Sequence, residues 1–250
     1  MKYTSLLSMT AAIMLSCTQS IAGTMGSIVA PKDWTWVGTL SAGPVWESAG
    51  QAQTFYLTPG IIKTYVASNV THVLADGEVF VGIQKNLPKM LQSQLGLTVA
   101  VTSNAKLSGN IWDDADSTFN NYSYSYQIQH THIAAKGKLL ADRGYWVIPW
   151  VSASLGVGFN RAHDFQNTPL TSEAVTMPNF ASNTQTRFTY TLGAGVQKVL
   201  NQHWQVGAGY EFADWGQSQL RGASGQTLNS GLSLNHLYTN GVLFNLTYLA

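Results

Sequence analysis

The sequence has little charge, one cysteine and no basic excess, and each shortage excludes a class of protein. Only 10% of the 250 residues are charged, against roughly a quarter in ordinary soluble domains, while 45% are hydrophobic. The 13 Lys and Arg nearly balance the 12 Asp and Glu, which argues against nucleic-acid binding because that requires a basic patch. Beyond the amino terminus, no apolar run approaches the roughly 20 residues of a spanning helix. Low charge without long apolar runs favours a membrane β-barrel.

The amino terminus, residues 1–22, has the features of a secretory signal peptide. Lys2 supplies the positive start, Leu6 to Leu15 form the apolar region, and Ser20-Ile21-Ala22 is a small-x-small cleavage site. The one cysteine, Cys17, lies inside this segment. A lipoprotein signal in which Cys17 is acylated is the less favoured alternative. Cleavage at the small-x-small site would leave a mature chain without a thiol, as suits a protein that crosses an oxidising periplasm without needing a disulfide.

The stretch from Phe188 to Phe212 contains two segments that alternate with period two around the polar turn Asn201-Gln202-His203. Large residues occupy one face of each segment, and glycine and polar residues occupy the other. Period two is the pattern of β-strands, so this stretch predicts a hairpin. In a membrane barrel the large residues meet lipid and the small ones line the lumen, whereas a soluble sandwich reverses the two faces. The hairpin alone does not decide between them.

The whole chain contains eight such strands. They are expected at about 34–46, 73–85, 91–102, 122–140, up to 159, two within 188–212, and 237–250. Long and short connections alternate between them, which favours a closed antiparallel barrel with short periplasmic turns and long external loops. Residues 103–121 are expected to be a polar loop. For residues 54–66 the sequence leaves two alternatives open: a polar connection, or two further strands that form their own hairpin above the membrane.

The segment 122–140 contains a conflict in side-chain phase. Tyr122, Tyr124, Tyr126 and Ile128 take the even phase, whereas the later apolar residues Ile133, Ala135 and Leu139 take the odd phase. One extra residue in a strand reverses the phase. We therefore expect a β-bulge near residues 128–131, beyond which the histidines and lysines of this segment point into the lumen.

Aromatic residues gather near the ends of the expected strands, in the pattern of two interfacial girdles. The girdle residues are predicted to be Trp34, Trp36, Trp204 and Tyr248 at the short-turn end, and Trp46, Tyr190 and Tyr238 at the loop end, with Tyr126 and Phe159 also near the loops.

Three segments carry a resemblance to a known family. They are L-G-A-G-V (192–196), W-Q-V-G-A-G-Y-E-F-A-D-W-G (204–216) and V-L-F-N-L-T-Y-L-A (242–250). They resemble the small eight-stranded outer-membrane barrels of Gram-negative bacteria, the OmpA-transmembrane and opacity-protein-like group. The resemblance implies an all-β, closed, antiparallel, eight-stranded transmembrane barrel over residues 23–250, located in the cell outer membrane. It also implies insertion by the barrel-insertion machinery through the C-terminal strand. Such barrels usually end in an aromatic residue, whereas this sequence ends Tyr248-Leu249-Ala250.

The candidate site residues are polar side chains expected to face the lumen. They are Glu78, Glu211, Lys136, Lys138, His130 and His132. The favoured interpretation is a plug of paired charges, because an unpaired buried charge is costly, and a gate is the alternative. Two histidines at this spacing are able to ligate a metal, but a structural site usually needs four ligands. Asp113, Asp114 and Asp116 are interpreted as a solvated acidic loop, with calcium binding as the alternative.

The predicted function is that of a surface protein, with a structural, adhesive or environment-contacting role for its long loops. The expected partners are outer-membrane lipid and a host or environmental ligand at the loops, the chain is expected to be monomeric, and no cofactor, metal or nucleic acid is expected. A narrow pore is the first alternative. A lipid A-modifying enzyme is the second, and it is disfavoured because His236 and Thr239 would lie on opposite faces of a strand.

Overall fold

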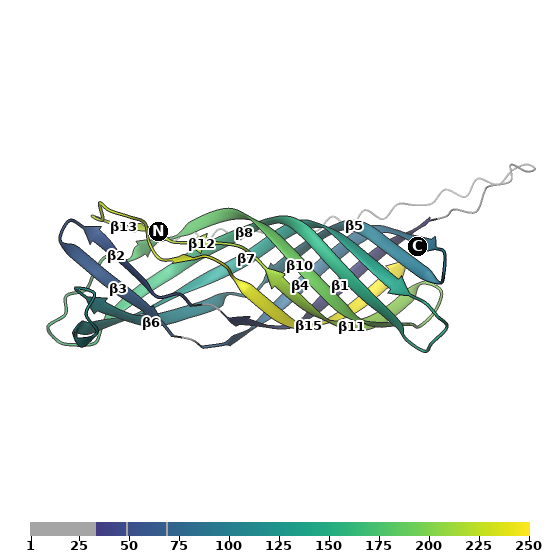
Figure 1. Ribbon diagram of the computed structural model, residues 1–250, viewed down its shortest axis with the longest axis horizontal. Coiled ribbons are helices and arrows are strands. Elements are labelled where there is room, and N and C mark those ends of the chain that lie inside the picture. Colours follow the sequence, from purple (N-terminus) through teal and green to yellow (C-terminus); the bar gives the residue numbers. More distant parts are fainter. Residues whose placement is uncertain (1–33, 49, 69) are drawn as a thin grey trace, which may run out of the picture. The chain divides into compact units, whose positions relative to one another are not determined.

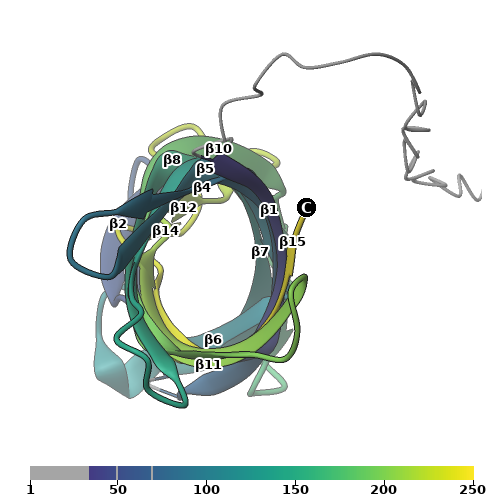
Figure 2. The same ribbon diagram turned by 90° about the vertical axis from the view of Figure 1, so that its right-hand side faces the viewer.

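The computed structural model describes residues 34–48, 50–68 and 70–250, and its regular structure is almost entirely β-strand. The predicted signal peptide, with Cys17, lies outside the described residues and stays a prediction. Eight long strands form a ring, which Figure 2 shows nearly end-on. They are β1 (Trp34–Ser48), β4 (His72–Leu87), β5 (Leu91–Thr102), β7 (Asn120–Ala141), β8 (Ile148–Pro169), β10 (Asn183–Val199), β11 (Trp204–Asp214) and β15 (Tyr238–Leu249). The predicted eight-stranded, all-β fold is confirmed.

The ring closes because every strand in it has two antiparallel neighbours. The order is β7-β5-β4-β1-β15-β11-β10-β8, and β8 pairs back onto β7. When paired residues are followed around the ring from Thr131 of β7, the path ends at Pro149 of β8. Pro149 is next to Trp150, and Trp150 pairs with Leu140 of β7. The ring thus closes with an offset of roughly ten residues along β7, which requires the strands to tilt by roughly 40° from the barrel axis.

The outer wall of the ring carries the large apolar side chains. Leu40, Leu95 and Leu97 are 56%, 64% and 63% exposed. The same face includes Val79, Val81, Val99, Ile133, Val151, Leu155, Val157, Leu192 and Phe244, all exposed. Thr, Ser, Gln and charged side chains are buried inside. A continuous apolar surface of this size marks contact with lipid, so the faces are arranged as in a transmembrane barrel.

The two ends of the barrel differ in their connections. Residues 88–90, 142–147 and 200–203 form the short turns at one end, which lies to the right in Figure 1. The long connections lie at the other end, so the predicted alternation is confirmed. β7 and β8 are each 22 residues long, about twice the 9–11 residues that a tilted strand needs to span a bilayer. Their outer halves therefore project beyond the membrane.

Three further strands continue the barrel wall at the long-connection end. They are β2 (Gln53–Thr58), β3 (Ile61–Ala67) and β6 (Ala105–Asp113), labelled at the left in Figure 1. β5 pairs with β7 only as far as Thr131, and β6 takes its place from Ile128 outward. β3 pairs with β6, and β2 with β3. The hairpin left open at 54–66 thus exists, whereas the prediction of a polar loop at 103–121 is wrong. β6 forms because Leu107 and Ile111 alternate with polar residues and bury their side chains.

The remaining elements are short. They are η1 (Ser117–Phe119), β9 (Phe180–Ala181), β12 (Ser218–Gln219), β13 (Arg221–Ala223) and β14 (Ser233–Leu234). β13 pairs with β9, and β12 with β14. The N–H groups of Thr227 and Leu228 donate to the carbonyl of Leu57, so the connection that contains β13 also covers the free edge of β2. Among the described residues, no helix is long and apolar enough to cross a membrane.

The predicted bulge at residues 128–131 is wrong. Even-numbered side chains of β7 point inward along its whole length, from Tyr122 to Leu140. The apolar phase changes because the surroundings change: the wall faces lipid at the membrane and water beyond it, so large residues turn inward in the outer half. Tyr126 accordingly is only 5% exposed and belongs to no girdle. In the β7–β8 pairing an extra residue lies instead in β8, where the pairs Gln127–His163 and Ser125–Gln166 flank a register shift. A second shift lies at the outer end of β7, between its pairs with Ile111 and Trp112 of β6.

The closed ring predicts heat-modifiable migration on a gel. Folded into detergent and left unheated, the protein is expected to run faster than the boiled sample, because a closed barrel stays compact until its strands separate. The unheated sample should show β-rich circular dichroism. A water-soluble protein that shows no difference in mobility would contradict the membrane barrel.

Candidate functional site

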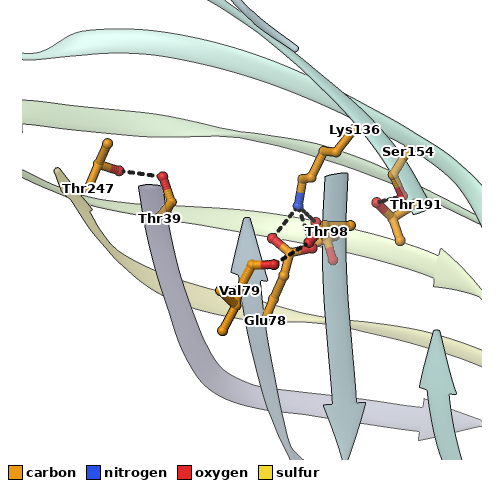
Figure 3. Close-up of polar contacts among 9 residues, drawn as sticks. Thr39, Glu78, Val79, Thr98, Lys136, Ser154, Thr191 and Thr247 are labelled. Carbon is orange, nitrogen blue, oxygen red and sulfur yellow. Dashed lines mark hydrogen bonds and ion pairs between the residues drawn. The ribbon is translucent and has the colours of Figure 1, made fainter. Parts of the chain in front are cut away.

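An ion-pair cluster crosses the lumen at mid-barrel. Lys136 of β7 reaches both carboxylate oxygens of Glu78 on β4, at 2.7 and 2.8 Å, and Oε2 of Glu211 on β11 at 3.0 Å. Figure 3 shows the Lys136 ammonium pointing at Glu78. The three strands are not neighbours in the ring, so one cation joins separate parts of the wall. Each group has an opposite charge within hydrogen-bonding distance, which meets the condition for burying charges.

Hydrogen bonds to uncharged side chains fill the lumen around this cluster. Lys138 donates to Oε1 of Gln197 at 2.7 Å, and its ammonium lies 4.5 Å from the centre of the Trp150 ring. Further pairs join Gln94 to Gln84, Gln197 to Gln205, Thr39 to Thr247 and Ser154 to Thr191. The cavity that remains beside Lys136 has a volume of about 30 Å³, room for only a few water molecules. The lumen is packed rather than open at this level.

His130 and His132 lie just outward of the ion pairs and bond to each other. Nε2 of His130 is 3.0 Å from Nδ1 of His132, and Nδ1 of His130 is 2.6 Å from Oδ1 of Asn160. The His130 ring also stacks on Trp215 at 4.3 Å. Asn160 in turn donates to the carbonyls of Trp215 and Gln217. These histidines therefore anchor the start of the last long connection. Over the described chain, no group of three or more His, Cys, Asp or Glu is positioned to hold a metal.

An apolar seal closes the lumen outward of the histidines. The connection 215–237 supplies Trp215, Leu220, Leu232, Leu234 and Leu237, all 5% exposed or less. They pack in one cluster with inward-facing residues of the wall, among them Tyr122, Tyr124, Tyr126, Ile128 and Phe165. The leucine, isoleucine and phenylalanine side chains of this cluster have no groups to solvate ions or water. The polar lumen and this seal thus form two barriers in series.

A pocket opens at the outer end of the barrel, beyond the seal. Its volume is about 370 Å³, within the range of small-molecule sites. The β2–β3 hairpin, β7, β8, the segment 175–180 and the segment 223–226 each supply part of the lining. The apolar lining residues are Leu57, Ile61, Tyr65, Tyr122, Phe165, Val175, Met177, Pro178, Phe180 and Ala223.

Aromatic rings form the innermost wall of this pocket. The ring centres of Phe165 and Phe180 are 4.7 Å apart, and those of Tyr65 and Phe180 are 5.5 Å apart. Phe55 stacks behind Tyr65 at 5.2 Å. Burial, with smaller effects from Tyr124 and Asp113, raises the pKa of Tyr65 above its ordinary value. The wall is therefore uncharged at neutral pH.

Several polar groups at the pocket are already engaged, and one buried acceptor is not. Lys63 forms an ion pair with Asp113 and lies over the Tyr122 ring. The Tyr122 hydroxyl donates to the carbonyl of Val175 at 2.8 Å. Asn167 donates twice from Nδ2, but its buried Oδ1 has no hydrogen-bond partner among the described residues.

Apart from Tyr126, which is buried, the predicted girdle residues lie on the outer wall, and all of them are exposed except Tyr190, which is half-buried. Two aromatic groups form at opposite ends of the lipid-facing belt. Trp204 contacts Tyr248 at 5.0 Å, and Phe212 lies between Tyr190 and Tyr238. This placement is compatible with interfacial girdles, and that assignment stays a prediction.

The other predicted candidates do not assemble into sites. Asp113 pairs with Lys63 and accepts from Asn121, while Asp116 caps η1 by accepting from Thr118. These contacts commit two of the three aspartates to the fold. His236 bonds to Asp214 at 3.0 Å and is half-exposed, whereas Thr239 is 2% exposed. His236 and Thr239 therefore do not meet as a base and a nucleophile.

The outer pocket was missed by the sequence reasoning. Its walls and inner rings come from segments interpreted as loops or left open as a hairpin, and among its apolar lining residues only Tyr122 belongs to a predicted strand. Two signals were present: the period-two pattern at 105–111, and the run of tyrosines whose phase opposes that of the lipid-facing residues.

Comparisons with known proteins bear on the fold only. The sequence matches no protein-family model and no curated protein. Neisserial surface protein A (NspA) has 12% identity and a TM-score of 0.42, covering 86% of this chain and 96% of that one. The outer membrane protease OmpT from Escherichia coli has 7% identity and a TM-score of 0.46, covering 86% and 97%. OprG from Pseudomonas aeruginosa has 11% identity and a TM-score of 0.40, covering 86% and 96%. Similarities this low assign neither an activity nor a ligand.

The closed eight-stranded ring, the apolar outer belt and the buried polar lumen are those of a small transmembrane β-barrel of the outer-membrane type. The chain is a protein of the outer membrane, with lipid around its belt, and the placement of its long connections at the cell surface stays a prediction.

Proposed function

We propose that this barrel is a non-conducting surface protein that contacts its environment by binding small apolar molecules at its outer end. The observation that carries the proposal is the apolar pocket of about 370 Å³, which lies beyond a sealed lumen. A concave, mostly apolar site with few polar groups is the usual form of a small-molecule site. The long external connections thus act together, as walls of one site.

The way the pocket is built supports binding rather than incidental surface roughness. Strand pairing fixes most of its walls, because β2, β3, β6 and β7 form one continuous sheet and β9 pairs with β13. The edge of β2 is also fixed, since Asn229 donates to the carbonyl of Tyr56 and Gln53 to that of Ser233. Preformed walls reduce the conformational entropy that a ligand must remove on binding.

The two alternative functions find less support. A narrow pore needs a continuous polar path, and both the ion-pair cluster and the apolar seal interrupt the lumen. A lipid-modifying enzyme needs a nucleophile beside a base, and the His236 and Thr239 side chains are separated by the wall. Insertion through the C-terminal strand and a monomeric state stay predictions.

The proposal predicts saturable binding of naphthalene, an uncharged apolar probe, to the protein in lipid nanodiscs. The methyl resonances of Ile61 and Met177, which line the pocket, should shift on titration. Those of Leu97, which faces lipid, should follow only the partition of naphthalene into the bilayer. The measurement is methyl nuclear magnetic resonance, with empty nanodiscs as the partition reference.

Two variants test whether those shifts report the pocket. Ala223→Phe and Ile61→Trp place a ring in its volume and should each abolish saturation of the Met177 shift. Ala153→Phe adds the same ring to the lipid-facing wall of β8 and should leave the titration unchanged. Shifts at Met177 that never saturate, or that survive in both pocket variants, would contradict ligand binding at this end.

A further inference from the structure

One polar atom in the outer pocket is left without a partner. Asn167 of β8 lines the pocket. Its Nδ2 donates to the carbonyl of Met177 at 3.1 Å and to Oδ1 of Asn179 at 2.8 Å. The Met177 carbonyl fixes the orientation of the side chain, because the opposite orientation would place Oδ1 of Asn167 against that carbonyl oxygen. Oδ1 of Asn167 therefore stays an acceptor, and it is buried without a partner among the described residues.

A buried acceptor in this position favours a ligand that carries a donor. Buried polar atoms in folded proteins are nearly always hydrogen-bonded, and the exceptions call for an explanation. Asn167 lies in a pocket where Tyr122 donates to Val175 and Lys63 pairs with Asp113, while Thr176 and Ser224 carry hydroxyls on exposed residues. This oxygen is thus the one buried acceptor without a partner among the described residues of the lining. A hydroxyl or N–H group on an otherwise apolar molecule would satisfy it.

The charges around the pocket favour an uncharged ligand. Lys63 is the one charged residue in the lining, and Asp113 already neutralises it. An anionic ligand would have to displace Asp113, which also accepts from Asn121. A cationic ligand would meet Lys63 without a free carboxylate in the lining. Burying an ion without a partner is costly, so both kinds of charged ligand are disfavoured.

The rings of the inner wall favour a flat ligand. Tyr65, Phe165 and Phe180 present ring faces and edges close together, with centres 4.7–5.5 Å apart along the cluster. Aromatic ligands gain from offset-stacked and edge-to-face contacts with such rings, beyond the burial of apolar area.

We propose that the outer pocket binds uncharged, phenol-like aromatic molecules, whose single hydroxyl donates to Oδ1 of Asn167 while the ring packs against Tyr65, Phe165 and Phe180. This inference rests on the proposed function, since it names the chemical class of the ligand for the same site. It adds two preferences of the pocket: for a ligand with a hydrogen-bond donor over an analogue without one, and for a neutral molecule over an anion.

The test compares three probes of one shape at pH 7: 2-naphthol, 2-methoxynaphthalene and the anion 2-naphthoate. Each is titrated into nanodiscs that carry the whole protein, and Met177 methyl shifts are corrected for partition into empty nanodiscs. We expect 2-naphthol to bind about tenfold more tightly than 2-methoxynaphthalene, the factor that one hydrogen bond of ordinary net strength supplies. We expect 2-naphthoate to bind at least about tenfold more weakly than 2-naphthol, because the pocket offers no free cation.

A variant links this preference to one atom. Asn167→Leu removes the acceptor and should bring 2-naphthol and 2-methoxynaphthalene to equal affinity. Asn179→Ala removes one partner of Nδ2 but leaves the acceptor, and should keep the tenfold preference.

The outcomes separate this inference from the function on which it rests. Equal binding of the two neutral probes to the unmodified protein, tighter binding of 2-naphthoate, or a preference that survives Asn167→Leu would each overturn the donor inference and leave the pocket standing. Absence of saturable binding for all three probes would overturn the pocket itself. The comparison of probes on the unmodified protein decides the matter even if Asn167→Leu fails to fold.

Discussion

Replacing Lys136 by methionine should destabilise the folded barrel by about 3–5 kcal/mol, the usual cost of removing one partner from a buried ion pair. Methionine fills much of the volume of lysine, so the expected loss is electrostatic. Without the ammonium, Glu78 and Glu211 would be left as two buried carboxylates that share one site. Unfolding by urea from lipid vesicles, followed by tryptophan fluorescence, measures the loss as a lower midpoint at unchanged slope.

Lys138→Met is the matched control. Lys138 is the next inward-facing residue of the same strand, but its hydrogen-bond partner is the neutral Oε1 of Gln197. Its removal leaves no carboxylate without its counter-charge, so the loss should be clearly smaller. Adding Glu78→Gln and Glu211→Gln to Lys136→Met should restore much of the stability, because the buried charges then disappear together. Equal losses for the two lysine variants would mean that the charge pairing contributes little.

Much of the fold was predictable because the bilayer imposes a simple rule on the sequence. Within the belt, large residues must face lipid and small or polar ones the lumen, so period-two alternation gives both the strands and their inward faces. Leu95, Leu97 and Val99 follow this rule, and so do Glu78 and Lys136 on the opposite face. The lumen residues follow from their phase alone, without knowledge of which partners they meet.

The outer half of the barrel was mispredicted because the same rule no longer holds there. Beyond the membrane the outer wall faces water, so Tyr122, Tyr124 and Tyr126 pack inward as in a soluble β-protein. If the outer wall is assumed to face lipid along its whole length, a bulge is needed to explain the inward-facing tyrosines. The same assumption makes β6 look like a loop, because this strand has few apolar residues. Whether large residues face outward or inward depends on their height along the barrel axis. That height is known only once the strands are paired in register.

The contacts between residues of the site also could not be predicted from the sequence. Asn160 and Trp215 are distant along the chain, yet both contact His130. The sequence around Asn167 does not indicate its role, because that role depends on contacts of its amide nitrogen with the segment 177–179. Such contacts arise from ring closure, which brings β8 and the last two connections together.

Replacing Trp215 by alanine should cost about 3–5 kcal/mol, as expected for a large aromatic side chain removed from a packed core. Trp215 is 2% exposed, stacks on His130 and contacts the apolar seal. Its loss would leave a void between the histidines and the leucines of the connection 215–237. Trp146→Ala is the control, because Trp146 is 79% exposed in a short turn, and its removal should shift the urea midpoint little.

The same variant tests whether the lumen has two independent barriers. Planar-bilayer recordings of the unmodified protein should show no steady conductance, because the ion-pair cluster and the seal both interrupt the path. Trp215→Ala should also stay closed despite its lower stability, because Lys136 still bridges Glu78 and Glu211 inward of the void. Steady conductance in Trp215→Ala alone would show that the seal is the one barrier and that water passes the ion pairs. The lumen cluster would then have to be reinterpreted as the gate of a narrow pore, the alternative that its packing now disfavours.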